Sequence, residues 1–109
     1  MHARKLHSGC INQNKLNVDI GNKKALVFCL ADWCGHCKNL IPEIKKLLQM
    51  IDHSKVSVFI VKEEDRDTMG KLDIRGFPTI FFTEGSGGLL QEHNGSRRAP
   101  DLVQKYGLS

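Results

Sequence analysis

Two cysteines separated by two residues, Cys34 and Cys37, lie at the junction of an apolar run and a long amphipathic segment. The run, residues 25–31, is apolar throughout, which is typical of a central strand covered on both faces. After the cysteines, apolar residues recur at helical spacing as far as Ile51. Any fold of this chain must therefore contain a strand, a tight turn and a helix that begins with the cysteine pair.

The position of this cysteine pair predicts its chemistry. The first turn of a helix has unpaired N–H groups and a partial positive charge, and both stabilise a thiolate. Because the thiolate is the form that attacks disulfides, Cys34 is predicted to be the attacking sulfur. Cys37 lies one turn further along the helix and is predicted to be the resolving thiol.

The predicted helix carries an apolar stripe and an internal proline. The stripe consists of Leu40, Ile41, Ile44, Leu47, Leu48 and Ile51. Pro42 has no N–H for the carbonyl of Lys38, four residues back, so we expect a kink there.

The remaining segments predict a mixed sheet. Strands are predicted at 5–8, 56–61, 78–82 and 89–93, and helices at 11–20, 68–72 and 99–106. Strand–helix–strand order early in the chain implies parallel pairing, and the late hairpin with its loop at 84–88 implies antiparallel pairing. The sequence therefore predicts one α/β domain over residues 1–109, with a mixed parallel and antiparallel central sheet and helices on both faces.

Composition and charge argue against several classes of protein. The chain is 40% hydrophobic and 26% charged, as globular domains are, and its net charge is +4. Its basic pairs lack the interleaved aromatic side chains of a nucleic-acid platform, and no apolar run approaches the roughly 18 residues of a membrane span. Neither an apolar leader nor a C-terminal retention signal is visible, which predicts a soluble intracellular protein or a processed chain of a lumenal compartment.

The other two cysteines do not extend the pair. Cys29 lies inside the apolar run and is predicted to be buried, and Cys10 is predicted to be a free thiol near the N-terminus. A zinc site would need two ligands beyond the pair, and the chain has no second Cys-x-x-Cys. His7, Cys10 and His53 are the candidate ligands for that alternative. No metal is expected.

Two motifs in this chain resemble the catalytic domains of protein disulfide isomerases, within the thioredoxin superfamily. The first is WCGHCK at 33–38, followed by Pro42, and the second is RGFPT at 75–79, where that family places its cis-proline. The resemblance extends over residues 25–106 through the same order of elements, whereas residues 1–24 match poorly. It implies the thioredoxin fold.

The resemblance also implies roles for the residues in these motifs. Cys34 would be the nucleophile and Cys37 the resolving thiol, joined in the oxidised state by a Cys34–Cys37 disulfide. Pro78, in cis, would face the dithiol and exclude metal from it. The backbone of Phe77 would pair with an extended substrate segment, and Trp33 would border the same groove.

Three further side chains are candidates for tuning the dithiol. His36, between the cysteines, is expected to favour the reduced form, which makes the disulfide more oxidising and places its potential nearer to that of disulfide isomerase than of thioredoxin. The resemblance implies that Arg97 approaches the resolving cysteine, and Arg98 is an equally reachable candidate.

The chain departs from the family at one buried position. Six residues before the nucleophile, where the family usually has Asp or Glu to relay a proton for the resolving thiol, this chain has Phe28. Counting back from Pro78, Phe59 stands at the position of the lysine that pairs with this acid in thioredoxins. Aromatic packing is therefore expected to replace both members of a buried charged pair. Bulk water, His36 or Arg97 is then expected to take part in removing the proton of Cys37.

Together these features predict a thiol–disulfide oxidoreductase that exchanges disulfides with protein or peptide substrates and with an electron donor or acceptor. No organic or metal cofactor is expected, and no nucleic-acid or membrane partner. The chain is expected to be a monomer. The alternatives are a redox-inert interaction module with the same fold, which the missing acid favours, and the zinc-binding domain.

Overall fold

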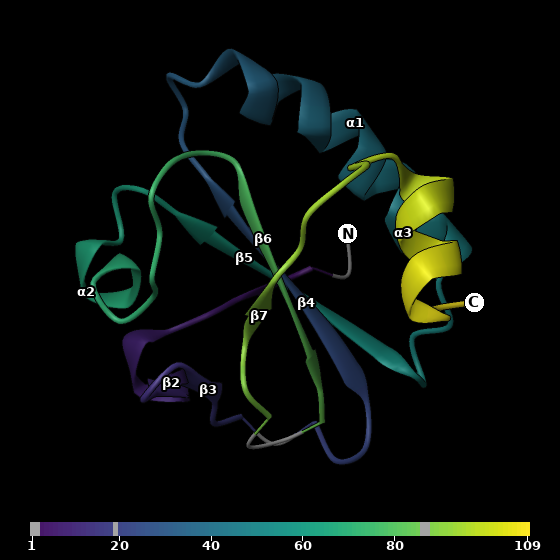
Figure 1. Ribbon diagram of the computed structural model, residues 1–109, viewed down its shortest axis with the longest axis horizontal. Coiled ribbons are helices and arrows are strands. Elements are labelled where there is room, and N and C mark those ends of the chain that lie inside the picture. Colours follow the sequence, from purple (N-terminus) through teal and green to yellow (C-terminus); the bar gives the residue numbers. More distant parts are fainter. Residues whose placement is uncertain (1–2, 19, 86–87) are drawn as a thin grey trace.

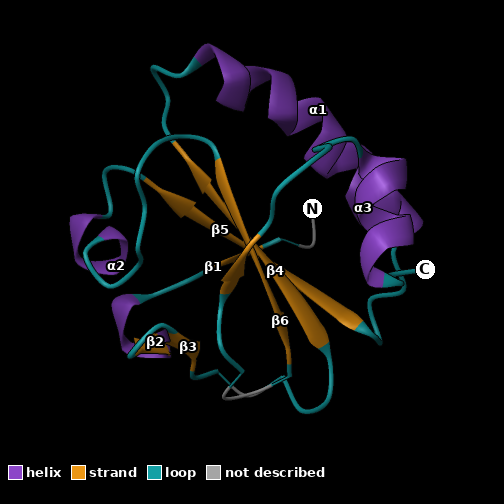
Figure 2. Ribbon diagram, viewed as in Figure 1, coloured by secondary structure: helices purple, strands orange, loops and turns teal. Residues whose placement is uncertain are grey.

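The computed structural model describes residues 3–18, 20–85 and 88–109. A five-stranded sheet runs through the centre of the molecule in the order β1-β5-β4-β6-β7 (Figure 2). Its strands are β1 (Arg4–Lys5), β4 (Lys24–Leu30), β5 (Val56–Lys62), β6 (Thr79–Glu84) and β7 (Gln91–Glu92). Strands β1 and β4 run parallel to β5, whereas β6 runs antiparallel to β4 and to β7, so the predicted mixed sheet is confirmed.

Strand β4 occupies the centre of this sheet because all its side chains after Lys24 are apolar and buried. Its odd and even residues enter different cores: Leu26, Phe28 and Leu30 face one side, and Val27 and Cys29 face the other. The strand delivers the chain directly to the cysteine pair, so the sheet fixes the position of the dithiol.

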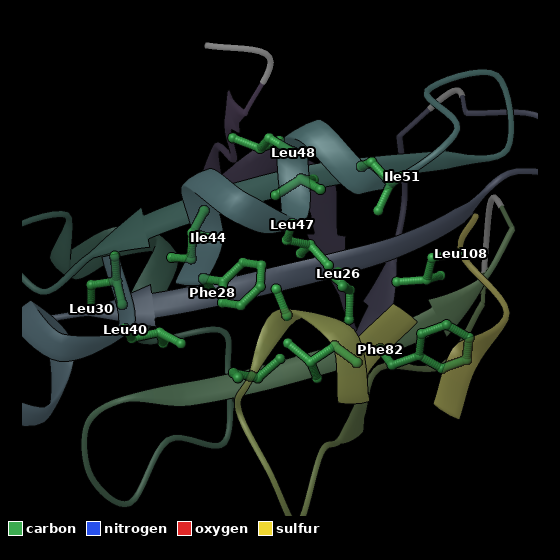
Figure 3. Close-up of a cluster of buried hydrophobic side chains, with 14 of the residues drawn as sticks. Leu26, Phe28, Leu30, Leu40, Ile44, Leu47, Leu48, Ile51, Phe82 and Leu108 are labelled. Atoms are coloured by element: carbon green, nitrogen blue, oxygen red, sulfur yellow. The ribbon is translucent and has the colours of Figure 1, made fainter. Parts of the chain in front are cut away.

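Helices cover both faces of the sheet (Figure 1). Helix α1 (Gly35–Met50) and helix α3 (Ala99–Tyr106) lie together on one face and bury an apolar cluster against it. Figure 3 shows this cluster, with Phe28 of the sheet beside Ile44 of α1. The other face is covered by the short helix α2 (Arg66–Met69), a 3-10 turn η1 (Ser8–Cys10) and the N-terminal hairpin.

The predicted helix at 11–20 is wrong. Residues in this segment form a hairpin of two short strands, β2 (Ile11–Asn12) and β3 (Lys15–Leu16). The turn residues Gln13 and Asn14 have positive φ values of 52° and 61°, as the two central residues of a type I′ turn require. Ile11 and Leu16 are buried, so the apolar residues that indicated a helical face instead point from paired strands into the core.

Other predicted elements differ in their limits. Helix α2 begins two residues before the predicted 68–72 helix, because the side chain of Asp65 accepts a hydrogen bond from the N–H of Thr68 and caps it. Strand β6 begins after Pro78 rather than on it, and β7 is shorter than the predicted 89–93 strand. The predicted loop at 84–88 includes residues 86–87, which lie outside the described part of the chain.

Helix α1 continues through Pro42, and the helix predicted at 99–106 is confirmed as α3. Of the stripe predicted along α1, Ile41 lies on the solvent side and is 41% exposed, whereas its neighbour Leu40 is buried. No helix in the described part of the chain is both long enough and apolar enough to cross a membrane.

The predicted pairing of Phe28 with Phe59 is wrong. Both side chains are buried, but in parallel register Phe28 is opposite Ile60, and Phe59 is opposite Val27. Phe59 points to the same face as its partner Val27, and successive residues of a strand point to opposite faces. Phe28 and Phe59 therefore belong to different cores. Phe28 therefore occupies the buried position beneath α1 together with Ile60 and Ile80, all of which are apolar.

Candidate active site

The dithiol lies where β4 ends and α1 begins. Cys34 is the N-terminal flanking residue of α1, with an extended backbone (φ −90°, ψ 118°), and its carbonyl accepts a hydrogen bond from the N–H of Lys38 at 3.2 Å. The N–H of Cys34 donates to the carbonyl of Ala31, which closes the turn between strand and helix. The Cys34 side chain therefore stands over the unpaired N–H groups of the first helical turn.

This position makes Cys34 more acidic than an ordinary cysteine. Burial of the sulfur raises the pKa of Cys34, but the N–H and thiol of Cys37, the N–H of His36 and the charge of Arg97 together lower it by more. The net effect is a lowered pKa. The thiolate is therefore stabilised by hydrogen bonds from the start of the helix, as expected for a sulfur at this position.

Cys37 has the opposite tendency. Its residue is buried, and its sulfur accepts a hydrogen bond from the N–H of Ala31 at 3.5 Å. Burial raises the pKa of Cys37, and the neighbouring Cys34 raises it further, against smaller opposing effects of the Ala31 N–H and Arg97. Both cysteines are free thiols in this structure. The pair thus consists of a more acidic sulfur, that of Cys34, and a less acidic one, that of Cys37.

A second backbone segment faces the dithiol. The Phe77–Pro78 peptide bond is cis, and the carbonyl of Phe77 lies 3.5 Å from the sulfur of Cys34, which donates to it in the thiol form. The hydroxyl of Thr79 donates to the carbonyl of Gly76 at 2.6 Å and braces this loop. The main-chain carbonyl of Phe77 therefore lies at the reactive sulfur.

A groove of about 610 Å³ runs beside this contact. Trp33 borders it and is 68% exposed, and its ring meets the ring of Phe77 edge to face at 5.9 Å between centroids. The indole N–H of Trp33 donates to Glu63 at 2.9 Å, which fixes the ring across the groove. The rest of the lining combines apolar and basic side chains, among them Ile74 and Arg75.

A smaller hollow of about 180 Å³ lies on the helix side of the dithiol. His36, Glu43, Arg97 and Arg98 are among the residues that line it. The arginines come from the segment between β7 and α3, more than 50 positions further along the chain than His36 and Glu43. The fold therefore brings two guanidinium groups near the start of α1.

A family model described as Thioredoxin matches residues 8–106 of this chain. The chain belongs to the thioredoxin family. The match starts at residue 8, so it includes most of the N-terminal segment that the motifs alone left outside the resemblance. The thioredoxin fold and the resemblance to disulfide isomerase domains are confirmed by these comparisons.

Several relatives similar to this chain are named protein disulfide-isomerases. The protein disulfide-isomerase of Hordeum vulgare is 34% identical over 84 residues, which are 72% of this chain and 16% of that protein. Protein disulfide-isomerase erp38 of Neurospora crassa is 40% identical over 90 residues, which are 77% of this chain and 24% of that protein. This chain of the thioredoxin family thus spans about a quarter or less of the length of these relatives.

Solved structures of thioredoxin domains have the same fold. The Trx4 domain of ERdj5 gives a TM-score of 0.76 at 26% identity and covers 98% of this chain and 95% of its own. Human ERp44 in form II gives a TM-score of 0.77 at 20% identity and covers 98% of this chain and 30% of its own. The likeness to ERp44 shows the fold alone.

The structure brings together the residues singled out in the sequence. Cys34, Cys37, Trp33, Phe77 and Pro78 surround one contact between α1 and the cis-proline loop of this thioredoxin domain. His36, Arg97 and Arg98 lie around the adjoining hollow.

Sequence reasoning missed two carboxylates in the same region. Glu63 holds the Trp33 ring, and Glu43 accepts a hydrogen bond from the N–H of Ala99 at 2.9 Å. Both lie in segments rich in charge, where nothing in the spacing distinguishes a bonded carboxylate from a solvated one.

The other cysteines lie apart from the dithiol. Cys29 is fully buried, and burial raises its pKa to about 12, which keeps it protonated at neutral pH. Cys10 is half-buried in the N-terminal segment. Among residues 3–18, 20–85 and 88–109, no three His, Cys, Asp or Glu side chains gather as ligands of one metal ion.

Proposed function

We propose that this chain is a thiol–disulfide oxidoreductase of the protein disulfide isomerase type, acting through Cys34 and Cys37. The observation that carries the proposal is the position of the Cys34 sulfur, at the N-terminus of α1 and 3.5 Å from the carbonyl of Phe77 in a cis peptide. Relatives named protein disulfide-isomerase support the same activity. Residues 1–109 act as one domain in this proposal, and the reaction needs no organic or metal cofactor.

The reaction proceeds in two exchanges. The thiolate of Cys34 attacks one sulfur of a substrate disulfide, so a mixed disulfide forms and the other substrate sulfur leaves as a thiolate. Cys37 then loses its proton and attacks the sulfur of Cys34, which releases the second substrate thiolate. The substrate gains two electrons and the enzyme is left with a Cys34–Cys37 disulfide. In the reverse direction, a substrate thiolate attacks that disulfide.

The proton of Cys37 leaves without help from a buried acid. At the position where the resemblance to disulfide isomerases implies such an acid, Phe28 and its neighbours are apolar. Bulk water and His36 are the candidate acceptors of this proton, whereas Arg97 would take part by stabilising the thiolate that remains; both side chains line the hollow beside α1. Because the pKa of Cys37 is raised, we propose that resolution of the mixed disulfide is the step most sensitive to pH.

The groove beside Trp33 is the proposed site for the substrate chain. In this proposal the substrate peptide is extended and contains the disulfide. Its backbone forms hydrogen bonds with the backbone of Phe77, as when a strand is added to a sheet edge. When Cys34 ionises, its sulfur no longer donates to the carbonyl of Phe77, which becomes free to accept an N–H of the substrate. Protein or peptide thiols and disulfides are the proposed substrates, together with an electron donor or acceptor of the same chemistry.

Reduction of insulin tests the proposed function directly. With a small dithiol as electron donor, the chain is expected to accelerate precipitation of the insulin B chain at least tenfold over the dithiol alone, which is a modest effect for a catalyst. A chain with both active-site thiols alkylated is the control and should match the dithiol alone. A wild-type rate equal to that control would favour the redox-inert module, which the apolar surroundings of Phe28 make the second candidate.

Replacement of His36 by alanine tests the proposed redox poise. The imidazole is exposed and lies between the two cysteines in the chain, where a ring N–H is expected to stabilise the Cys34 thiolate. Its loss should destabilise the reduced form and lower the reduction potential by up to about 30 mV, a tenfold change in the equilibrium with glutathione. The wild-type potential is expected nearer to the reference value for disulfide isomerase, about −180 mV, than to that for thioredoxin, about −270 mV. An unchanged potential would show that His36 is only a solvated turn residue.

A further inference from the structure

We propose that Glu43 is a positioning residue for the dithiol: it fixes the first residue of α3 against α1 and thereby holds Arg97 in the hollow next to the start of α1. The inference rests on the proposed function, because it assigns Glu43 a part in setting the reactivity of Cys34. It concerns a contact between two segments 56 positions apart in the chain.

The carboxylate of Glu43 makes a bond that α3 cannot make for itself. Its Oε1 atom accepts the N–H of Ala99, the first residue of α3, at 2.9 Å. The residue before the helix, Arg98, provides no side-chain cap. Ala99 is fully buried, so its N–H would otherwise be left without an acceptor at a helix start. A carboxylate from α1 therefore serves as the cap of α3.

The segment that carries Arg97 is fixed on its other side as well. The hydroxyl of Ser96 accepts the N–H of Arg98 at 3.2 Å and donates to Asp101 at 2.6 Å. The carbonyl of Ser96 accepts a hydrogen bond from the buried ring of His93 at 2.8 Å. Arg97 thus lies between two fixed points, the hydrogen bonds of Ser96 after β7 and the hydrogen bond of Ala99 to Glu43. Of these two, only the hydrogen bond to Glu43 connects Arg97 to the helix that bears the dithiol.

Glu43 is well suited to hold this contact at neutral pH. The hydrogen bond from Ala99, followed by that from Lys46, lowers the pKa of Glu43, so the carboxylate is charged. Lys46 lies 3.3 Å from Oε2 and leaves Oε1 to Ala99. Glu43, Arg97 and His36 line the same hollow, and the charge of Arg97 lowers the pKa of both active-site cysteines against the larger effect of burial.

The tether and the charge of Glu43 act on Cys34 with opposite signs, which makes them separable. A negative charge near the dithiol disfavours a thiolate, so removing the charge alone makes Cys34 more reactive. Releasing α3 lets Arg97 move away, so removing the tether makes Cys34 less reactive. Glu43→Gln removes the charge and keeps an oxygen that can accept the N–H of Ala99. Glu43→Ala removes both.

The test is the rate at which iodoacetamide alkylates Cys34 at pH 6.5, measured on the full chain with Cys37, Cys10 and Cys29 replaced by serine or alanine. We expect Glu43→Ala to slow alkylation about threefold, because a smaller fraction of Cys34 is then ionised. Glu43→Gln should react as fast as the parent or faster. In an Arg97→Ala background, Glu43→Ala should cause no further slowing, because there is no guanidinium left to position.

Two control variants separate this effect from stability. Asp52→Asn is matched to Glu43, because Asp52 also accepts a backbone N–H at 2.9 Å, from Ser54, and lies 4.0 Å from a lysine three residues later. It stands beyond the far end of α1, so it should leave the alkylation rate unchanged. Lys46→Met removes the ion pair but not the tether and should also leave it unchanged. Thermal melts followed by circular dichroism define conditions under which each variant and the parent are both folded, and alkylation rates are compared only under those conditions.

The results that overturn the inference differ from those that overturn the proposed function. Faster or unchanged alkylation in Glu43→Ala, or equal slowing with and without Arg97, would show that Glu43 does not act through Arg97. A parent protein whose Cys34 reacts no faster than free cysteine at pH 6.5 would instead overturn the proposed function itself. Slowing in Asp52→Asn equal to that in Glu43→Ala would assign the effect to stability and also overturn the inference.

Discussion

Replacing Cys34 by serine is expected to lower the rate of disulfide exchange at least about a thousandfold, since loss of a nucleophile removes the reacting atom itself. The lowered pKa of Cys34 makes its sulfur the thiolate of the pair, whereas the raised pKa of Cys37 keeps the second sulfur protonated. Both cysteines are buried, at 6% and 2% exposed, so the difference in pKa rather than in exposure makes Cys34 the attacking sulfur. Insulin reduction under fixed dithiol concentration measures this loss.

Replacing Cys37 by serine is expected to give a different defect. Cys34 still attacks, but nothing resolves the product, so the mixed disulfide accumulates and survives denaturing electrophoresis without reductant. Cys29→Ala is the control. The Cys29 thiol is buried in the core on the other face of the sheet and has a pKa of about 12, so its replacement should leave exchange unchanged. Comparable trapping by Cys34→Ser would show that Cys37, not Cys34, is the attacking sulfur.

Replacing Phe28 by alanine is expected to reduce the free energy of unfolding by about 3–5 kcal/mol. The Phe28 ring is fully buried between the sheet and α1, beside Ile44 and Leu40, as Figure 3 shows. Its removal leaves a cavity that neighbours from a strand and a helix cannot fill without moving. For a domain of this size the loss corresponds to a fall of about 12 °C or more in the melting temperature, measurable by calorimetry.

The companion variants of Phe28 separate packing from chemistry. Phe28→Leu keeps most of the volume and should lose less than half as much stability. Phe28→Glu restores the acid that the family usually has and, in molecules that remain folded, should speed resolution of the mixed disulfide near pH 7. If Phe28→Ala unfolds as readily as the wild type, the core beneath the dithiol is not packed as described. If Phe28→Glu leaves the resolution rate unchanged, the missing acid is irrelevant to Cys37.

The centre of the fold and the reactive motifs could be predicted because local pattern decides them. Strand β4 is apolar at every position after Lys24, and α3 has the limits predicted from its sequence. The N-terminal hairpin could not be predicted, because strands of two residues are too short to show alternation. Its turn also relies on two residues other than glycine, Gln13 and Asn14, at positive φ.

The strand register and the long-range contacts could not be predicted from the sequence for a different reason. Counting residues placed Phe59 at the position of the lysine that pairs with the acid replaced by Phe28. In the sheet, Ile60 is opposite Phe28, and the Phe59 side chain enters the other core. The bond from Ala99 to Glu43 likewise depends on how α3 packs on α1. Such contacts are set by tertiary packing, which leaves no periodic signal along the chain.

A pH titration of the Cys34 thiol in the reduced chain, monitored by thiolate absorbance near 240 nm, tests most directly whether the start of α1 makes this sulfur acidic. Cys34→Ser serves as the blank that removes the contribution of the other thiols. We expect a pKa clearly below the value of about 8.5 for a free cysteine, because hydrogen bonds from the start of α1 stabilise the thiolate. A pKa at or above that value would contradict this expectation.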